Sequence, residues 1–235
     1  MSHFVHRSRE QEIMDDFHHG GEVIHQTLRE LEIINRWLGG NAVTLAGVRK
    51  LLNGPPNGTL TIADLGCGGG EMLKLIAGMG RKANIPMRLT GIDANPHIIE
   101  FARQHSSTYP EIDYSTVNLF SEEFSSRKFD IYVATLVVHH FSDEELVGLL
   151  RILIRQASRG VVINDIHRHW FAFHSIRWLT RLFSNSSMVK FDAPLSVLRA
   201  FTRKELEDLL SKAGISTYHL VWKWAFRWQL IITPV

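Results

Sequence analysis

The sequence is short of the features that mark secreted, membrane-spanning and nucleic-acid-binding proteins. A single cysteine in 235 residues excludes an internal disulfide framework and cysteine-rich metal sites. No stretch approaches the roughly 18 uncharged apolar residues of a membrane-spanning helix, and the polar start carries no apolar secretion signal. The formal net charge of +2 gives no electrostatic ground for binding nucleic acid. With 45% hydrophobic residues, these absences predict a globular protein of the cytoplasm.

From residue 60 onward the sequence contains a regular alternation of apolar runs and helical patterns. Each run is short, almost continuously apolar and followed by a segment with helical spacing, which is typical of a parallel sheet covered on both faces. The apolar runs are 60–66, 87–95, 112–120, 129–137 and 160–166. Two further runs close to the end of the chain predict a hairpin that completes the sheet, at 216–222 and 228–235.

The region before this alternation is predicted to be helical. Apolar residues recur at helical spacing over 9–38, with a glycine pair dividing the segment, and a second helix is expected at 42–52. The turn-forming stretch "NGPPNG" then separates a helical N-terminal cap, residues 1–56, from a core at 57–235.

Within the core, capping residues indicate where helices begin and end. Ser142 precedes an acidic first turn and predicts a helix at 142–157. Thr202 and Glu205 have the spacing of a capping box, and Gly214 predicts the end of the helix that they begin.

The stretch "TIADLGCGGG" at residues 61–70 places a glycine-rich turn directly after the first apolar run, where a doubly wound sheet receives a nucleotide. A dinucleotide fingerprint would need glycine at the position of Glu71, and a P-loop would need a lysine that is missing. Asp64 before the glycines and Glu71 after them disfavour a phosphate and favour a cationic ligand. Asp93, at the end of the second run, is placed to hydrogen-bond both hydroxyls of a ribose. These features together indicate S-adenosylmethionine, which is cationic, contains adenosine and has no phosphate.

The residues "ADLGCGGG" followed by "GIDAN" resemble motifs I and II of the class I S-adenosylmethionine-dependent methyltransferases. The resemblance continues through "VNLF", "FDIYVATLVVHHF" and the final hairpin, over residues 57–235. It implies an α/β, Rossmann-like sheet of seven mostly parallel strands with an antiparallel last strand, a helical N-terminal cap and an inserted lid segment at 168–200. It also implies which residues contact the methionine, ribose and adenine parts of the cofactor: Asp64, Gly66, Cys67, Gly68, Asp93, Ala94, Asn118, Leu119 and Thr135. Asn118 departs from the aspartate usual in the family, but its amide oxygen can still accept a hydrogen bond from adenine.

Histidines gather after the fourth and fifth apolar runs, on the side of the sheet where a substrate would lie. Methyl transfer to a phenol needs positioning and benefits from a base, and the candidates in order of preference are His140, His167 and His139. For each of them a purely structural role in packing or hydrogen bonding is an equal alternative. No metal site is predicted, because His167 and His169 have no carboxylate cluster beside them beyond Asp165.

A narrower resemblance concerns a bacterial group related to ubiquinone and menaquinone methyltransferases, often associated with type III polyketide synthases. It rests on "EIMDD", "LRELEIINRWLGG" and "DAPLSVLRAFTRKELEDLLSKAGI", and it implies that the N-terminal helices close over the cofactor. The aromatic, arginine-rich helix predicted at 168–183 fits a lid over an apolar acceptor, a part of the core, or a surface in weak contact with a membrane. The candidate substrate contacts from these segments and from the fifth run are Met14, Asn35, Trp37, Asp165, His169, Trp170 and Phe173.

The sequence therefore predicts a methyltransferase acting on a small, lipophilic acceptor of the phenol or hydroquinone type, with O-methylation favoured. C-methylation of a quinol or polyketide ring is the alternative, followed by an NAD-dependent oxidoreductase and a non-catalytic cofactor-binding module. The segment "ATLVVHHF" lacks the Asn/Asp-Pro-Pro-Tyr element of enzymes that methylate nucleic-acid amino groups. The expected partner is a small molecule, and the oligomeric state is left open.

Overall fold

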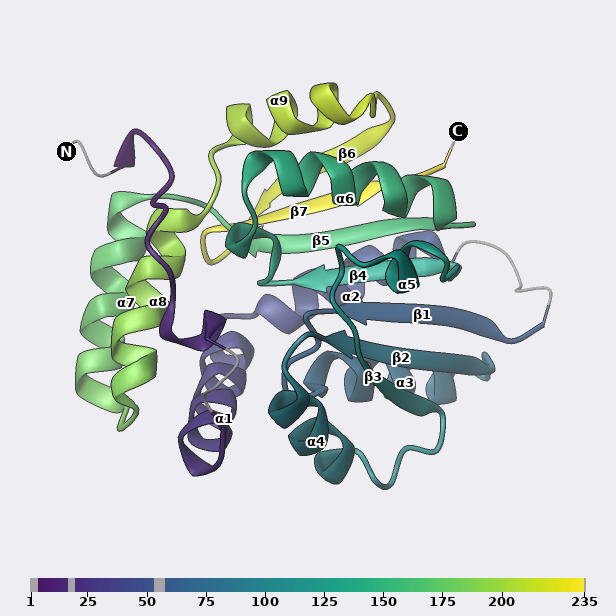
Figure 1. Ribbon diagram of the computed structural model, residues 1–235, viewed down its shortest axis with the longest axis horizontal. Coiled ribbons are helices and arrows are strands. Elements are labelled where there is room, and N and C mark those ends of the chain that lie inside the picture. Colours follow the sequence, from purple (N-terminus) through teal and green to yellow (C-terminus); the bar gives the residue numbers. More distant parts are fainter. Residues whose placement is uncertain (1–3, 17–19, 53–57, 235) are drawn as a thin grey trace.

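The computed structural model describes residues 4–16, 20–52 and 58–234, and its central feature is a seven-stranded sheet (Figure 1). The strand order is β3-β2-β1-β4-β5-β7-β6. β7 is antiparallel to its neighbours β5 and β6, while β1 to β5 run parallel, which confirms the predicted sheet with its reversed last strand. The strands are β1 (Leu60–Leu65), β2 (Met87–Asp93), β3 (Ile112–Thr116), β4 (Ile131–Thr135), β5 (Gly160–Ile166), β6 (Tyr218–Lys223) and β7 (Arg227–Ile232).

Helices cover both faces of the sheet, which explains why the central strands are almost continuously apolar. One apolar cluster joins the strands to α2, α3 and α4, and another joins them to α5, α6 and α9 on the opposite face. The bounds of these helices are α2 (Gly40–Leu51), α3 (Glu71–Ala83), α4 (Pro96–His105), α5 (Glu122–Ser125), α6 (Asp143–Gln156) and α9 (Arg203–Ala213). α2, although it comes from the predicted N-terminal cap, packs on β4, β5 and β7 as part of the covering layer.

The predicted capping residues begin and end their helices as expected. Ser142 and Glu145 form a reciprocal capping box at the start of α6, and Thr202 and Glu205 form another at the start of α9. Gly214 ends α9 in the left-handed region, with φ of 78°.

A third group of helices lies beyond the carboxyl ends of the parallel strands (Figure 1). It consists of α1 (Glu22–Trp37), α7 (Trp170–Phe183) and α8 (Ser187–Arg199), with the short 3-10 helix η2 (Ile13–Asp15) against α8. Buried apolar side chains from α1, α4 and α8 form a small cluster there: Ile24, Leu28, Ile98, Phe101 and Met188. These helices cover the carboxyl ends of the parallel strands. No helix among the described residues is long and apolar enough to cross a membrane.

The prediction of a helix over 9–38 is wrong for the described residues before Gly21. Between Glu12 and Asp16 the chain makes only the single 3-10 turn of η2. The cause is tertiary, because the Asp192 carboxylate of α8 accepts the N–H groups of Ile13 and Met14 at 2.8 and 3.1 Å. The second predicted helix is present as α2. The predicted border at residue 56 lies outside the described residues.

Candidate active site

A cavity of about 370 Å³ lies at the carboxyl ends of β1, β2 and β4, beneath α1 and η2. Every residue predicted to bind the cofactor lines it: Asp64, Gly66, Cys67, Gly68, Asp93, Ala94, Asn118, Leu119 and Thr135. Three of the residues predicted to act on or contact the acceptor, Met14, Asn35 and His140, line the same cavity. The structure thus brings these segments of distant sequence into one site.

The glycine turn after β1 presents main chain rather than side chains to this cavity. Gly66 and Gly68 have φ angles of 63° and 51°, a region that favours glycine. The N–H groups of Gly66 and Cys67 donate to the carbonyl of Ile92 at 2.8 and 3.1 Å, which ties the turn to the end of β2. A Cβ atom at Gly68 would meet only Leu28 of α1, at 3.7 Å. A ligand can therefore approach the backbone here closely.

The wall of the cavity is acidic. Five carboxylates line it, and no lysine or arginine is among the described residues that do so: the acids are Asp15, Glu32, Asp64, Glu71 and Asp93. Burial, together with the charge of Asp93, raises the pKa of Asp64 to about 8. Burial also raises the pKa of Asp93, although the N–H of Asn95 donates to its carboxylate at 3.0 Å. A site of this kind repels phosphate and stabilises a cation, so its residues fit a sulfonium cofactor with a free ribose.

Cys67 is buried in the same turn, and burial raises the pKa of its thiol well above the usual value. A Cβ on Gly91 of β2 would come within 2.9 Å of its sulfur atom. The side chain therefore packs against β2 as a small buried residue. A reactive thiol would be accessible and have a lowered pKa, and Cys67 has neither property.

A family described as "Methyltransferase domain" matches residues 62–160, which run from β1 to the start of β5. A ubiquinone biosynthesis O-methyltransferase of Bartonella quintana is 27% identical over 183 residues, covering 74% of this chain and 67% of that protein. A protein of the same description from Methylobacterium is 33% identical over 96 residues, covering 40% of this chain and only 36% of its own length.

Solved structures share the fold at low sequence identity. Human N-acetylserotonin methyltransferase, in complex with SAM, has a TM-score of 0.66 and 19% identity, over 97% of this chain and 60% of that one. The plantazolicin methyltransferase BpumL, in complex with SAH, has a TM-score of 0.64 and 18% identity, over 90% of this chain and 89% of that one. The matched domain and the shared fold both indicate a methyltransferase, and the acidic site at the glycine turn fits its cationic cofactor.

Residues 62–160 thus form a methyltransferase domain, and the chain around them has the fold of solved methyltransferases.

In this methyltransferase, histidine and aromatic side chains line the cavity at the end away from Asp64. His140, in the 3-10 helix η3 (Val138–His140) after β4, has its Nδ1 2.6 Å from Asp15 Oδ1. Phe120 and Phe141 line the same part of the wall, with ring centroids 5.0 Å apart in an edge-to-face arrangement. An aromatic acceptor would thus meet apolar rings and one imidazole.

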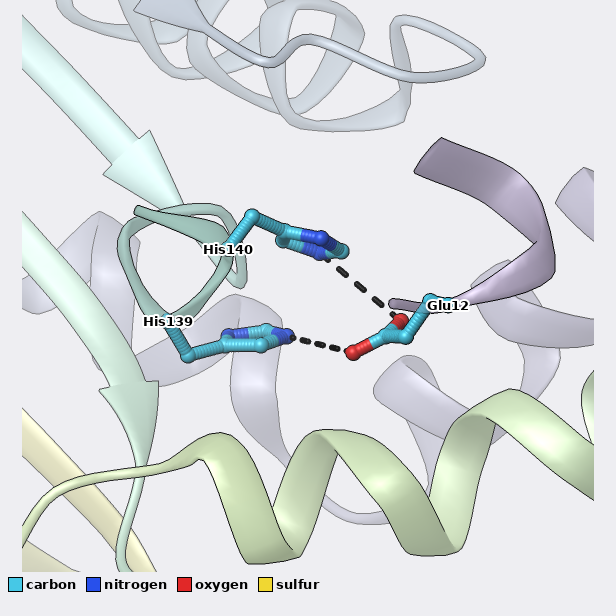
Figure 2. A group of neighbouring side chains, drawn as sticks. All are labelled: Glu12, His139 and His140. Carbon is cyan, nitrogen blue, oxygen red and sulfur yellow. Dashed lines mark ion pairs between the residues drawn. The ribbon is translucent and has the colours of Figure 1, made fainter. Parts of the chain in front are cut away.

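His139 lies behind His140, where it is buried and does not line the cavity. Its Nδ1 is 2.7 Å from Asp165 Oδ1, and its Nε2 is 3.6 Å from Glu12 Oε1. The Nε2 of His140 is 3.9 Å from Glu12 Oε2, so both imidazoles face one carboxylate (Figure 2). The predicted substrate contact Asp165 is therefore a buried partner of His139.

The remaining predicted residues lie away from this cavity. Trp222 Nε1 donates to His167 Nδ1 at 3.2 Å, and His169 caps α7 by accepting the N–H of Phe171 at 3.2 Å. Phe173 packs edge-to-face on Phe4, and Trp170 is 57% exposed. Trp37 lines a second, apolar cavity, which lies between α1 and α7. No residue of α7 or α8 lines the main cavity, so the lid and the acceptor contacts assigned to this region stay predictions.

The sequence reasoning missed Glu12 and Asp15 as site residues. Both lie in the segment around "EIMDD", which was noted only for its resemblance to other methyltransferases. The available signal was the group of three acids next to an apolar pair in that segment. Leu28 and Asn41, which also line the cavity, carry no local signal.

The raised pKa of Asp64 makes the stability of the ligand-free protein depend on pH. Between the unfolded pKa near 3.8 and the folded pKa of about 8, the folded state holds a proton that the unfolded state has lost. Asp64 alone should therefore make the free energy of unfolding fall as pH rises from 5 to 8, by at most about 1.4 kcal/mol per pH unit. Urea unfolding at several pH values would measure this slope. In Asp64→Asn the slope should be shallower, and an unchanged slope would contradict the assignment.

Proposed function

We propose that the enzyme transfers the methyl group of S-adenosylmethionine to a hydroxyl of a small, apolar phenol or hydroquinone. The observation that carries the proposal is the two-ended cavity, acidic at the glycine turn and lined by His140 and phenylalanines at the other end. The name "Ubiquinone biosynthesis O-methyltransferase" of the matched relatives supports an acceptor of this chemistry and transfer to oxygen.

The residues of the acidic end are proposed to bind and orient the cofactor. Asp93, at the end of β2, would accept hydrogen bonds from the ribose hydroxyls. Glu71, together with Asp64 once the bound cation lowers its raised pKa, would offset the positive charges of the methionine part. Leu119 would pack on adenine, and Asn118 would accept from its amino group. Asn118 Oδ1 already accepts the N–H of Phe120 at 2.9 Å, which fixes the orientation of its amide. When bound, the cofactor supplies an electrophilic methyl carbon.

The residues of the other end are proposed to position the acceptor and receive its proton. Asp15 orients the ring of His140 through Nδ1, so the remaining nitrogen, Nε2, is the atom that would take the hydroxyl proton as the oxygen–methyl bond forms. Phe120 and Phe141 would hold an aromatic ring and exclude water from the transfer. Positioning of this kind supplies much of the acceleration in a methyl transfer.

A methylation screen with simple phenols and hydroquinones tests the proposal. We expect a methyl ether, identified by mass spectrometry and NMR, and a kcat about 10²–10⁴-fold lower in His140→Ala, the range ascribed to general acid–base catalysis. His167→Ala should keep its kcat, because His167 hydrogen-bonds Trp222 and does not line the cavity.

The screen also separates the alternatives. A methyl group on a ring carbon would show the C-methyltransferase. Cofactor binding with no acceptor methylated across the phenols and hydroquinones would contradict the proposed acceptor class. Loss of activity in His167→Ala with full activity in His140→Ala would exchange the roles of the two histidines.

A further inference from the structure

We propose that Glu12, His139 and His140 bind a divalent zinc ion. The three side chains come from two segments that are more than 120 residues apart, the turn before η2 and the helix η3 after β4. One ligand atom of each residue lies within 4.8 Å of the other two. Figure 2 shows both imidazole rings pointing at the two oxygens of the same carboxylate. The donors converge on one small volume between them.

The separations of these donor atoms suit a bridging ion better than direct contact. The nitrogen–oxygen distances of 3.6 and 3.9 Å exceed a hydrogen bond, so neither imidazole bonds to Glu12 directly. Ligand atoms at about 2.0–2.1 Å from a tetrahedral zinc ion lie about 3.3 Å apart. Small side-chain movements toward a central ion would therefore complete the coordination.

Each imidazole is also held in the manner typical of a metal-bound histidine, whose other ring nitrogen donates to a carboxylate or carbonyl. His139 Nδ1 is 2.7 Å from Asp165 Oδ1, and His140 Nδ1 is 2.6 Å from Asp15 Oδ1. With the protons on Nδ1, both Nε2 atoms present a lone pair toward Glu12. Two carboxylates thus fix the tautomer and the direction of two neighbouring histidines.

An unpartnered buried atom gives the independent sign of a ligand. His139 is 2% exposed, and its Nε2 has no hydrogen-bond partner among the described residues. A buried nitrogen without a partner loses its hydration with no compensation. The atom is aimed at Glu12 across the 3.6 Å gap, and a metal ion there would satisfy it.

The charges of the cluster leave room for a divalent cation. Three carboxylates, Glu12, Asp15 and Asp165, surround the two imidazoles. One guanidinium that contacts them is that of Arg199, whose Nη1 is 2.6 Å from Asp15 Oδ2 and whose Nε is 3.9 Å from Glu12 Oε1. A divalent ion between the imidazoles would balance part of the negative charge of these carboxylates.

The donor set selects the kind of ion. Two imidazole nitrogens and one carboxylate oxygen suit zinc and other first-row transition metals, whereas magnesium and calcium prefer oxygen ligands. Three protein ligands leave a four-coordinate zinc ion one position for water or a substrate oxygen. His140 lines the main cavity, so the ion would be within reach of the acceptor end. An ion on His140 Nε2 would occupy the atom proposed above to take the proton, and it would instead lower the pKa of an acceptor hydroxyl bound to it.

Zinc binding can be measured without acceptor or cofactor, so the test does not depend on the proposed function. Tag-free full-length protein, stripped with a chelator, is titrated with Zn²⁺ by calorimetry, and a Co²⁺-loaded sample gives the visible absorption of four-coordinate cobalt. We expect one tight Zn²⁺ per chain and no comparable binding of Mg²⁺. Glu12→Gln and His139→Asn should abolish the tight site, and Asp165→Asn should weaken it about 10–100-fold.

His219→Asn is the matched control, because His219 is an exposed histidine on β6 outside the cluster. It should bind Zn²⁺ as tightly as the unaltered chain. Circular dichroism checks that each variant is folded, and His140→Asn replaces any variant that is not. A chain without a tight Zn²⁺ site, or a tight site that persists in folded Glu12→Gln and His139→Asn, would overturn the proposal.

Discussion

In Asp93→Ala, binding of S-adenosylmethionine should be at least about 100-fold weaker than in the unaltered chain. Hydrogen bonds to a charged group contribute about 1.5–3 kcal/mol each, and a factor of ten in affinity corresponds to about 1.4 kcal/mol. A carboxylate that accepts from two ribose hydroxyls would therefore account for at least two factors of ten. Calorimetric titration with S-adenosylmethionine and with its demethylated product would measure the loss in both.

Asp113→Ala is the control for this experiment. Asp113 is an exposed aspartate on β3, paired in register with Thr90 of β2, and it does not line the cavity. Its replacement should leave the affinity within a factor of about two. NAD should bind neither protein well, because the acid-lined turn disfavours a pyrophosphate. An Asp93→Ala chain that binds S-adenosylmethionine normally would exclude the ribose contact.

Gly66→Ala should lower the free energy of unfolding by about 2–5 kcal/mol and remove cofactor binding. An alanine at φ of 63° costs about 1–2 kcal/mol in backbone strain. Its Cβ would also lie 2.4 Å from Cγ2 of Val137, and overpacking of this kind costs about 1–3 kcal/mol. Relief of the clash would displace the turn or the chain after β4, and both line the cavity. Urea unfolding and calorimetry on the same variant would measure the two effects.

Gly78→Ala provides a control with the opposite expected sign. Gly78 lies inside α3, and a Cβ there would meet no other atom within 4 Å. Alanine in a helix interior is favoured over glycine by about 0.5–1 kcal/mol, so this variant should be slightly more stable and should bind the cofactor normally. If both glycine variants changed stability in the same direction, the conformational argument for Gly66 would fail.

The sequence predicted the sheet and the cofactor end of the cavity because both depend on short-range features. Burial on both faces makes each parallel strand apolar throughout, and Asp64, Gly66 and Asp93 lie within a residue of a strand end or at one. The carboxyl ends of neighbouring parallel strands meet at one edge, so motifs separated in sequence come together without any knowledge of tertiary contacts.

The acceptor end was less predictable because it depends on contacts between distant segments. Glu12 reaches His139 because α8 holds its segment: Asp192 accepts from the backbone of Ile13 and Met14, and Ser196 donates to the Glu12 carboxylate. The aromatic stripe of α7 shows the same limit. Trp178 and Phe183 are 70% and 76% exposed, and periodicity alone does not indicate whether such a face is covered.

The position of β7 determines the order in which the protein can be completed during its synthesis. β7 fills the place between β5 and β6, all six of its residues are buried, and Gln229 within it donates to the carbonyl of Val43 in α2. Among the described strands β7 is thus the last to be made, yet it is an interior strand that contacts α2, a helix made before all of them. Until it emerges, β5 has an unpaired edge and α2 lacks part of its packing surface. The nascent chain can fold β1 to β5 early, but it closes the sheet only after β7 has been made.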